Sequence, residues 1–196
     1  MEQQTLFALN VLLSLALGIG LSAAAGFRVF VPFLVMSAAA LTGNLNLGES
    51  WSWIGTYPAL FVFATASVLE IAAYYVPWLD NLLDSVATPA AVVAGVVITA
   101  AVVTDLSPLL TWTLAIIAGG GTAGLIQTGT VLARGLSTAT TAGLGNFTVA
   151  SGELAGSVIT SILAVILPWL TLTLVLALLI WVIRHMRRTP RTPITT

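Results

Sequence analysis

The chain consists mostly of long apolar segments that carry almost no charge, and this feature restricts it to a membrane. A hydrocarbon core about 30 Å thick is crossed by roughly 20 apolar residues as a helix, since lipid cannot satisfy unpaired backbone groups. Hydrophobic residues make up 58% of the 196 residues and charged residues only 7%, too few for a water-soluble surface. Candidate segments are 5–25, 27–42, 57–77, 88–105, 108–126, 127–143 and 147–184. We predict an all-α polytopic membrane protein, one membrane domain over 1–196, with about six to eight helical segments.

Three of these segments are expected to be irregular. Segments 27–42 and 127–143 are too short or too polar to span comfortably, so we expect half-helices, re-entrant segments or helices buried among others. The glycines of "IAGGGTAG" predict a break before residue 127. Residues 147–184 would extend about 57 Å as one helix, so we expect a kink or break at Pro168.

The regions outside the apolar segments indicate the topology. "PWLDNLLDSVATP", with Asp80 and Asp84, is expected to be an aqueous or interfacial loop. "MEQQTLFALN" lacks the basic residues of a signal peptide, so we predict a retained first span. The basic tail, 185–196, follows the last span, and the positive-inside rule places it in the cytoplasm. The arginines that flank the last span are Arg184, Arg187, Arg188 and Arg191.

The residue types that are missing exclude several classes of chemistry. The chain has no cysteine and no lysine, which removes disulfides, thiolate metal sites, cysteine nucleophiles and Schiff-base chemistry. A single histidine, His185, leaves little material for a metal site or a catalytic triad. We therefore predict no enzymatic activity, no catalytic residue, no metal and no cofactor. We expect membrane lipids as partners and no nucleic acid. A homo-oligomer is compatible with the sequence.

An internal duplication is indicated when the chain is shifted by 100 residues. "LEIAA" around Glu70 then has a counterpart in "GELAG" around Glu153, and each follows a matched segment. The identities fall at Gly20, Ala23, Val31, Ser37, Ala39 and Gly43 against Gly120, Ala123, Val131, Ser137, Ala139 and Gly143. The predicted repeats are about 5–80 and 108–167, inverted or parallel, an arrangement common in transporters.

Two glutamates inside the spans are candidate coupling residues. Glu153 shares a helical face with small and hydroxylated residues, namely Ser157, Thr160, Ser161 and Ala164. Glu70 similarly shares a face with Ala66, Ala73 and Tyr74. Charges at membrane depth normally face protein or water. Both glutamates are expected in the interior, close to each other or to an arginine, either as structural ion pairs or as proton- or cation-binding groups.

A polar stripe in 127–143 is the candidate solute-contacting face. At helical spacing it comprises Gln127, Thr130, Arg134, Ser137, Thr138 and Thr141. A helix in lipid has no use for such a face, so it lines a hydrated cavity or a dry seam, and we expect it to be the most hydrated surface at membrane depth. Arg28 lacks a matching polar face and is predicted only as a charge partner.

Several stretches resemble a bacterial family of small integral membrane proteins, domain of unknown function 4126. They include "GFRVFVP", "LEIAAYYVPWLDNLLD", "ATPAAVVAG", "DLSPLLTW", "IAGGGTAG" and "STATTAGLGN". The resemblance covers about residues 10 to 165. It implies a helical protein of the bacterial inner membrane and brings no established activity or binding residue.

These features support three functional hypotheses. The first is a small secondary transporter or permease for a polar or anionic solute, coupled to protons or cations through Glu70 and Glu153. The second is a non-transporting membrane scaffold held by structural Arg–Glu pairs, and the third is a channel-like pore. A hydrated cavity reaching both glutamates favours transport, whereas direct dry Arg–Glu contacts favour a scaffold.

Overall fold

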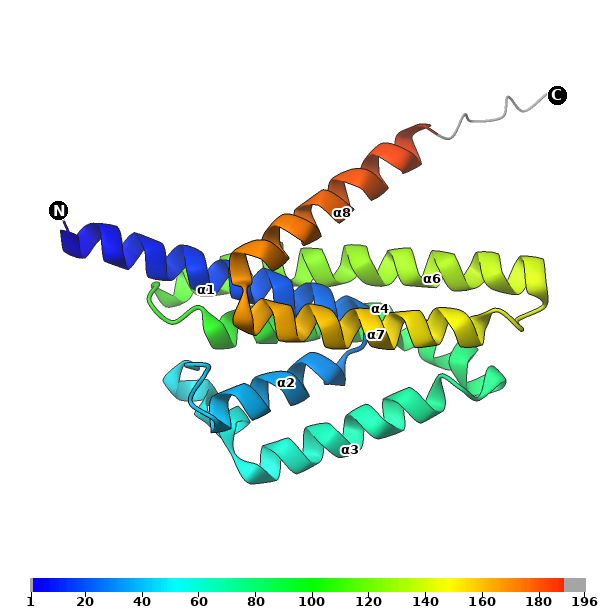
Figure 1. Ribbon diagram of the computed structural model, residues 1–196, viewed down its shortest axis with the longest axis horizontal. Coiled ribbons are helices and arrows are strands. Elements are labelled where there is room, and N and C mark those ends of the chain that lie inside the picture. Colours follow the sequence, from blue (N-terminus) through cyan, green and yellow to red (C-terminus); the bar gives the residue numbers. More distant parts are fainter. Residues whose placement is uncertain (1, 189–196) are drawn as a thin grey trace.

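The computed structural model describes residues 2–188, with side chains at all of these except 77–82, 84, 182–183 and 185–188. The described part is entirely helical and confirms the all-α prediction (Figure 1). Its elements are α1 (Glu2–Phe27), α2 (Phe30–Leu41), the 3-10 helix η1 (Glu49–Gly55), α3 (Tyr57–Ala73), α4 (Pro77–Val102), α5 (Pro108–Leu114), the π-helical turn η2 (Ala115–Gly120), α6 (Gly121–Thr141), α7 (Asn146–Ile166) and α8 (Pro168–Arg188).

Several of these helices have the dimensions of membrane spans. Four stretches are long and apolar enough to cross a bilayer: Glu2–Phe27, Ser85–Val102, Pro108–Thr141 and Asn146–Ile166. A fifth candidate is η1 together with α3, two helices bent by 66° relative to each other. The apolar helices α2 and Pro168–Trp181 are shorter. The architecture is that of a multi-pass helical membrane protein.

The second half of α1 forms the centre of the bundle. It packs against α4, α6, α7 and α8, and its buried residues are mostly glycine, alanine and serine. A Cβ added at Gly26 would lie 2.6 Å from the carbonyl oxygen of Ala123, so only glycine fits where α1 crosses α6. Small residues at such crossings let helix backbones approach closely in lipid, where no hydrophobic force drives association.

The turn between α1 and α2 lies inside the bundle. In Figure 1 it falls midway along the molecule, whereas the α3–α4 and α6–α7 connections lie at the right-hand end. The backbone groups at the end of one helix and the start of the next lack intrahelical partners. Within a bilayer these groups must be satisfied by protein. The α1–α2 turn therefore requires polar side chains around it.

The predicted break before residue 127 is wrong. Residues 108–141 form one continuous helical stretch, and the glycines lie in and next to its π-helical turn η2. A Cβ added at Gly95 of α4 would lie 2.5 Å from the carbonyl oxygen of Gly119. These glycines permit the close crossing of two helices, and the backbone absorbs the local strain as a π turn instead of a break.

Two further expectations have opposite outcomes. The predicted loop around Asp80 and Asp84 is wrong, because α4 already begins at Pro77 and continues through Pro89. Proline is well tolerated at the first position of a helix, where its missing N–H removes no bond. The predicted break at Pro168 is confirmed: α7 ends at Ile166, and α8 leans away from the other helices (Figure 1).

The two segments matched by the 100-residue shift follow different backbone paths. The chain turns at Arg28–Val29 within the first segment, whereas the second segment is helical from residue 118 to 141. Internal duplication stays a prediction.

Candidate functional site: a buried arginine–glutamate cluster

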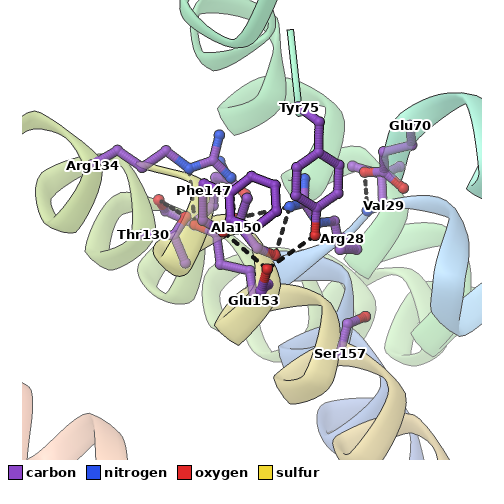
Figure 2. A network of polar contacts seen from close by, with 12 residues as sticks. Arg28, Val29, Glu70, Tyr75, Thr130, Arg134, Phe147, Ala150, Glu153 and Ser157 are labelled. Atoms are coloured by element: carbon purple, nitrogen blue, oxygen red, sulfur yellow. Dashed lines mark hydrogen bonds and ion pairs between the residues drawn. The ribbon is translucent and has the colours of Figure 1, made fainter. Parts of the chain in front are cut away.

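Glu153 of α7 is the centre of a buried charged cluster. Its side chain is 4% exposed. Arg134 of α6 holds the carboxylate with both arms of its guanidinium: Nε donates to Oε1 at 3.0 Å, and Nη2 donates to Oε2 (Figure 2). Bidentate pairing of this kind is the strongest arginine–carboxylate geometry and fixes both side chains.

Arg28 approaches the same carboxylate from the α1–α2 turn. Its Nη2 lies 3.4 Å from Oε2 of Glu153 and donates a 2.9 Å hydrogen bond to the carbonyl oxygen of Ala150. Its side chain is 1% exposed, and its Nε and Nη1 have no hydrogen-bond partner among the described residues. The predicted role of Arg28 as a charge partner is thus met at Glu153. Its place at the end of α1 is also favourable, since the negative end of the helix dipole stabilises a cation.

The ring of Tyr74 lies against both guanidinium groups. The Arg28 Cζ is 3.7 Å from the ring centroid and the Arg134 Cζ is 4.0 Å from it. An aromatic face attracts cations, so the ring stabilises two like charges that would otherwise repel each other. Helical spacing puts Tyr74 on the face of Glu70 and does not by itself predict contact with the arginines. The sequence feature that could have indicated this role is the position of the aromatic residue Tyr74, one helical turn after Glu70.

Glu70 has a different environment from Glu153. Its carboxylate accepts hydrogen bonds from the backbone N–H groups of Val29, at 2.7 Å, and Phe30, at 3.0 Å. It therefore caps the N-terminus of α2, where an anion is favoured by the helix dipole. These described hydrogen bonds join Glu70 to backbone rather than to an arginine. The two glutamates expected to act alike have separate structural roles.

The polar stripe of α6 is divided into two halves. Gln127, Thr130 and Arg134 are buried. Thr138 and Thr141 are exposed, and Ser137 is half-buried. The exposed residues close the α6–α7 connection: the Thr138 hydroxyl accepts from Asn146 Nδ2 at 3.0 Å, and Thr141 Oγ1 accepts from the Gly145 N–H at 2.8 Å. Contact of the stripe with a solute stays a prediction.

The hydroxylated face of Glu153 packs against α1, as its small residues suggested. Ser157 donates a 3.0 Å hydrogen bond to the carbonyl oxygen of Ala24. Across α1, Ser22 donates to the carbonyl oxygen of Gly95 at 2.9 Å. These hydrogen bonds from serine hydroxyl groups hold the end of α1 against its neighbours and therefore fix the position of Arg28.

Each glutamate also borders a cavity. A cavity of 460 Å³ near the start of α2 is lined by Glu70 together with apolar residues of α3 and α4. A second, of 440 Å³, is lined by Thr130, Glu153 and apolar residues of α6, α7 and α8. Both volumes are within the range of small-molecule sites.

Comparison with known proteins gives one match. The family model described as "Domain of unknown function (DUF4126)" matches residues 15–188. It extends past the resemblance noted from the sequence, which ended near residue 165, and so includes α8. No curated protein and no solved structure matches the chain. The family match covers every residue of the buried cluster, and the chain belongs to the DUF4126 family.

Proposed function

We propose that this protein is a small secondary transporter of an anionic solute, in which Glu153 couples the solute to a proton. The observation that carries the proposal is the buried cluster of Arg28, Arg134 and Glu153 beside a helix turn inside the bundle. Ionisable groups at membrane depth are costly and mark transport pathways more often than they serve stability alone. We place the protein in the bacterial inner membrane, with its C-terminus in the cytoplasm.

The coupling follows from competition between Glu153 and the solute for the guanidinium group of Arg134. With Glu153 ionised, both arms of Arg134 are occupied by its carboxylate. When Glu153 takes up a proton, its neutral carboxyl group no longer holds the guanidinium as an ion pair. A carboxylate or phosphate of the solute then takes its place, since the planar fork fits either group. One proton and one negative charge enter together, so the cluster keeps the same net charge.

The helix geometry supports the same proposal. Transporters commonly bind their solutes at discontinuous helices near the membrane midplane, where helix ends face the site. Here α1 and α2 meet at a turn that contains Arg28 and Val29. This turn lies midway along the molecule in Figure 1. The π turn η2 and the break at Leu167–Pro168 are two further places where helices depart from regular geometry. Such places allow rigid segments to move relative to each other.

Flux measurements in proteoliposomes test the proposal. Vesicles with a trapped pH dye receive succinate or inorganic phosphate outside under an inward proton gradient. We expect wild-type protein to carry protons inward with the anion, and Glu153→Gln, which mimics the protonated acid, to fold normally but lose the dependence on the gradient. Glu49→Gln, at an exposed position of η1, is the matched control. Wild-type flux no greater than that of empty vesicles, across a panel of carboxylates and phosphates, would reject transport of these anions.

The direct contact between Arg134 and Glu153 favours a second candidate, a non-transporting scaffold. Both side chains are buried and joined by two hydrogen bonds, as in a structural pair. In that case Glu153→Gln leaves two arginines uncompensated and destabilises the fold, since breaking a buried pair costs about 3–5 kcal/mol. Loss of folded protein without any measurable flux in the wild type is the result that selects the scaffold.

A further inference from the structure

A groove runs between α8 and the paired helices α6 and α7. It has a volume of 440 Å³, and its apolar walls include Leu125 and Leu132 of α6 and Leu178 and Leu179 of α8. A smaller cavity of 130 Å³ shares Phe27, Ile126 and Leu178 with it and continues towards the start of α8. The two form an elongated apolar channel along the helices, the shape that accommodates a hydrocarbon chain.

One part of this groove is polar. Thr130 and Glu153 both line it. Directly next to Glu153 lie Arg134, hydrogen-bonded to its carboxylate, and Arg28, 3.4 Å from Oε2. Arg28 is almost completely buried, yet within the described part of the chain its Nε and Nη1 meet no acceptor. Unmade hydrogen bonds of a buried guanidinium are costly, and an anionic acceptor would remove that cost.

Two glycines face this space and keep it open. Gly129 and Gly152 both line the groove, and a Cβ added at either would meet no atom within 4 Å. Gly121, on the same helix as Gly129, is equally open but lies outside the groove. The chain therefore offers substitutions that fill the groove without a clash, and a matched one that does not.

We propose that the groove binds the hydrocarbon chain of an anionic amphiphile, whose carboxylate or phosphate head lies at Thr130 and Glu153 beside the two arginines. This inference rests on the proposed function and names its substrate class. The apolar walls select the chain, and the arginines select the charge of the head. Protonation of Glu153 neutralises the carboxylate that lines the groove and gives the head access to Arg28 and Arg134.

Spin-labelled lipids in nanodiscs test this site. The probes are a spin-labelled stearate, a spin-labelled phosphatidic acid and, as a zwitterionic reference, a spin-labelled phosphatidylcholine. We expect the protein to immobilise one equivalent of the stearate or phosphatidic acid probe with about tenfold preference over phosphatidylcholine. The two anionic probes distinguish a carboxylate from a phosphate head. Equal immobilisation of all three probes means ordinary boundary lipid only and overturns the proposal.

The glycine variants locate the binding. We expect Gly129→Leu and Gly152→Leu each to reduce the preference for the anionic probe by about tenfold, and Gly121→Leu to leave it unchanged. A loss that is the same for all three variants overturns the assignment to the groove. Succinate flux separates this inference from the proposed function. If coupled flux occurs but the protein retains no anionic probe, the amphiphile site is rejected and the transport function stands. If the groove retains an anionic probe but no anion is transported, the transport function is rejected and the amphiphile site stands.

Discussion

At the scale of single residues, Tyr74 explains how two buried arginines share one site. Its ring contacts both guanidinium groups, at 3.7 and 4.0 Å from the centroid. Each contact of this kind contributes about 0.5–2 kcal/mol, more where the cation is desolvated. The ring therefore offsets part of the repulsion that would otherwise separate Arg28 from Arg134.

Replacing this ring tests its contribution. We expect Tyr74→Leu to lower the free energy of unfolding by about 1–2 kcal/mol, and Tyr74→Phe to retain most of the stability because the aromatic face remains. Denaturant titration of the purified protein measures both changes. Tyr57→Leu is the control, because Tyr57 is 69% exposed. Equal stability of the leucine and phenylalanine variants would show that the ring contributes by volume rather than by its interaction with cations.

Glu70 is predicted to be a capping residue and not a coupling residue. Its carboxylate accepts from two backbone N–H groups at the start of α2. We expect Glu70→Ala to cost about 1 kcal/mol of stability, the usual effect of losing a helix cap, and Glu70→Gln to cost less because one acceptor oxygen remains. Coupled flux should survive Glu70→Gln and be lost in Glu153→Gln. Loss of coupling in both variants would restore the paired role that the sequence suggested.

At the scale of elements, α6 combines a buried half with an exposed half. Its first polar residues face α1 and α7 beside the charged cluster, and its last ones close the connection to α7. A single polar stripe in the sequence thus serves two purposes: its buried half lies at the charged cluster, and its exposed half closes the connection to α7. We therefore expect the exposed half of the stripe to be hydrated and the buried half to be shielded from water.

Cysteine substitution measures that division directly, since the chain has no native cysteine. We expect a membrane-impermeant thiol reagent to label cysteines at Thr138 and Thr141 rapidly, and those at Gln127 and Thr130 slowly, in proportion to their exposure. Leu132, an exposed apolar position of α6, is the lipid-facing control and should stay unlabelled. Rapid labelling at Gln127 and Thr130 would show a water-filled cavity along the whole stripe.

At the scale of the whole molecule, α8 and the arginines near its end indicate the orientation in the membrane. It leans away from the other helices (Figure 1), and large apolar residues along it, such as Leu176 and Trp181, are exposed. Arg184 near its end is also exposed. Arg187 and Arg188 have no described side chain, and Arg191 and the tail from residue 189 lie outside the described residues.

The orientation of the molecule follows from these arginines. We expect the C-terminus to face the cytoplasm, because positive charge beside a span is retained on that side. A reporter fused after Thr196 that is active only in the cytoplasm should be active, and one that requires the periplasm should be silent. Replacing all four arginines by glutamine is expected to weaken this preference. Activity of the periplasmic reporter alone would contradict the assigned topology.

The sequence by itself determined the helical class and the charged members of the site. Long apolar segments without charge leave helices as the favoured form, because each helix satisfies its own backbone. Helical spacing placed Glu153 on a face of small residues, and the cost of a buried charge implied a partner, either Glu70 or an arginine. Proline at 168 marked the break before α8 for an equally local reason, the loss of a helical hydrogen bond.

Only the tertiary structure decided how these parts act together. The glycines before α6 did not break the helix, because Gly95 and Gly119 let α4 cross it closely. Glu70 caps α2 because the chain turns at Arg28–Val29, and Tyr74 contacts two arginines, one from that turn and one from α6. These contacts join residues far apart in the chain. Helical periodicity reports which face a side chain lies on, but the partner of that face depends on how the helices pack.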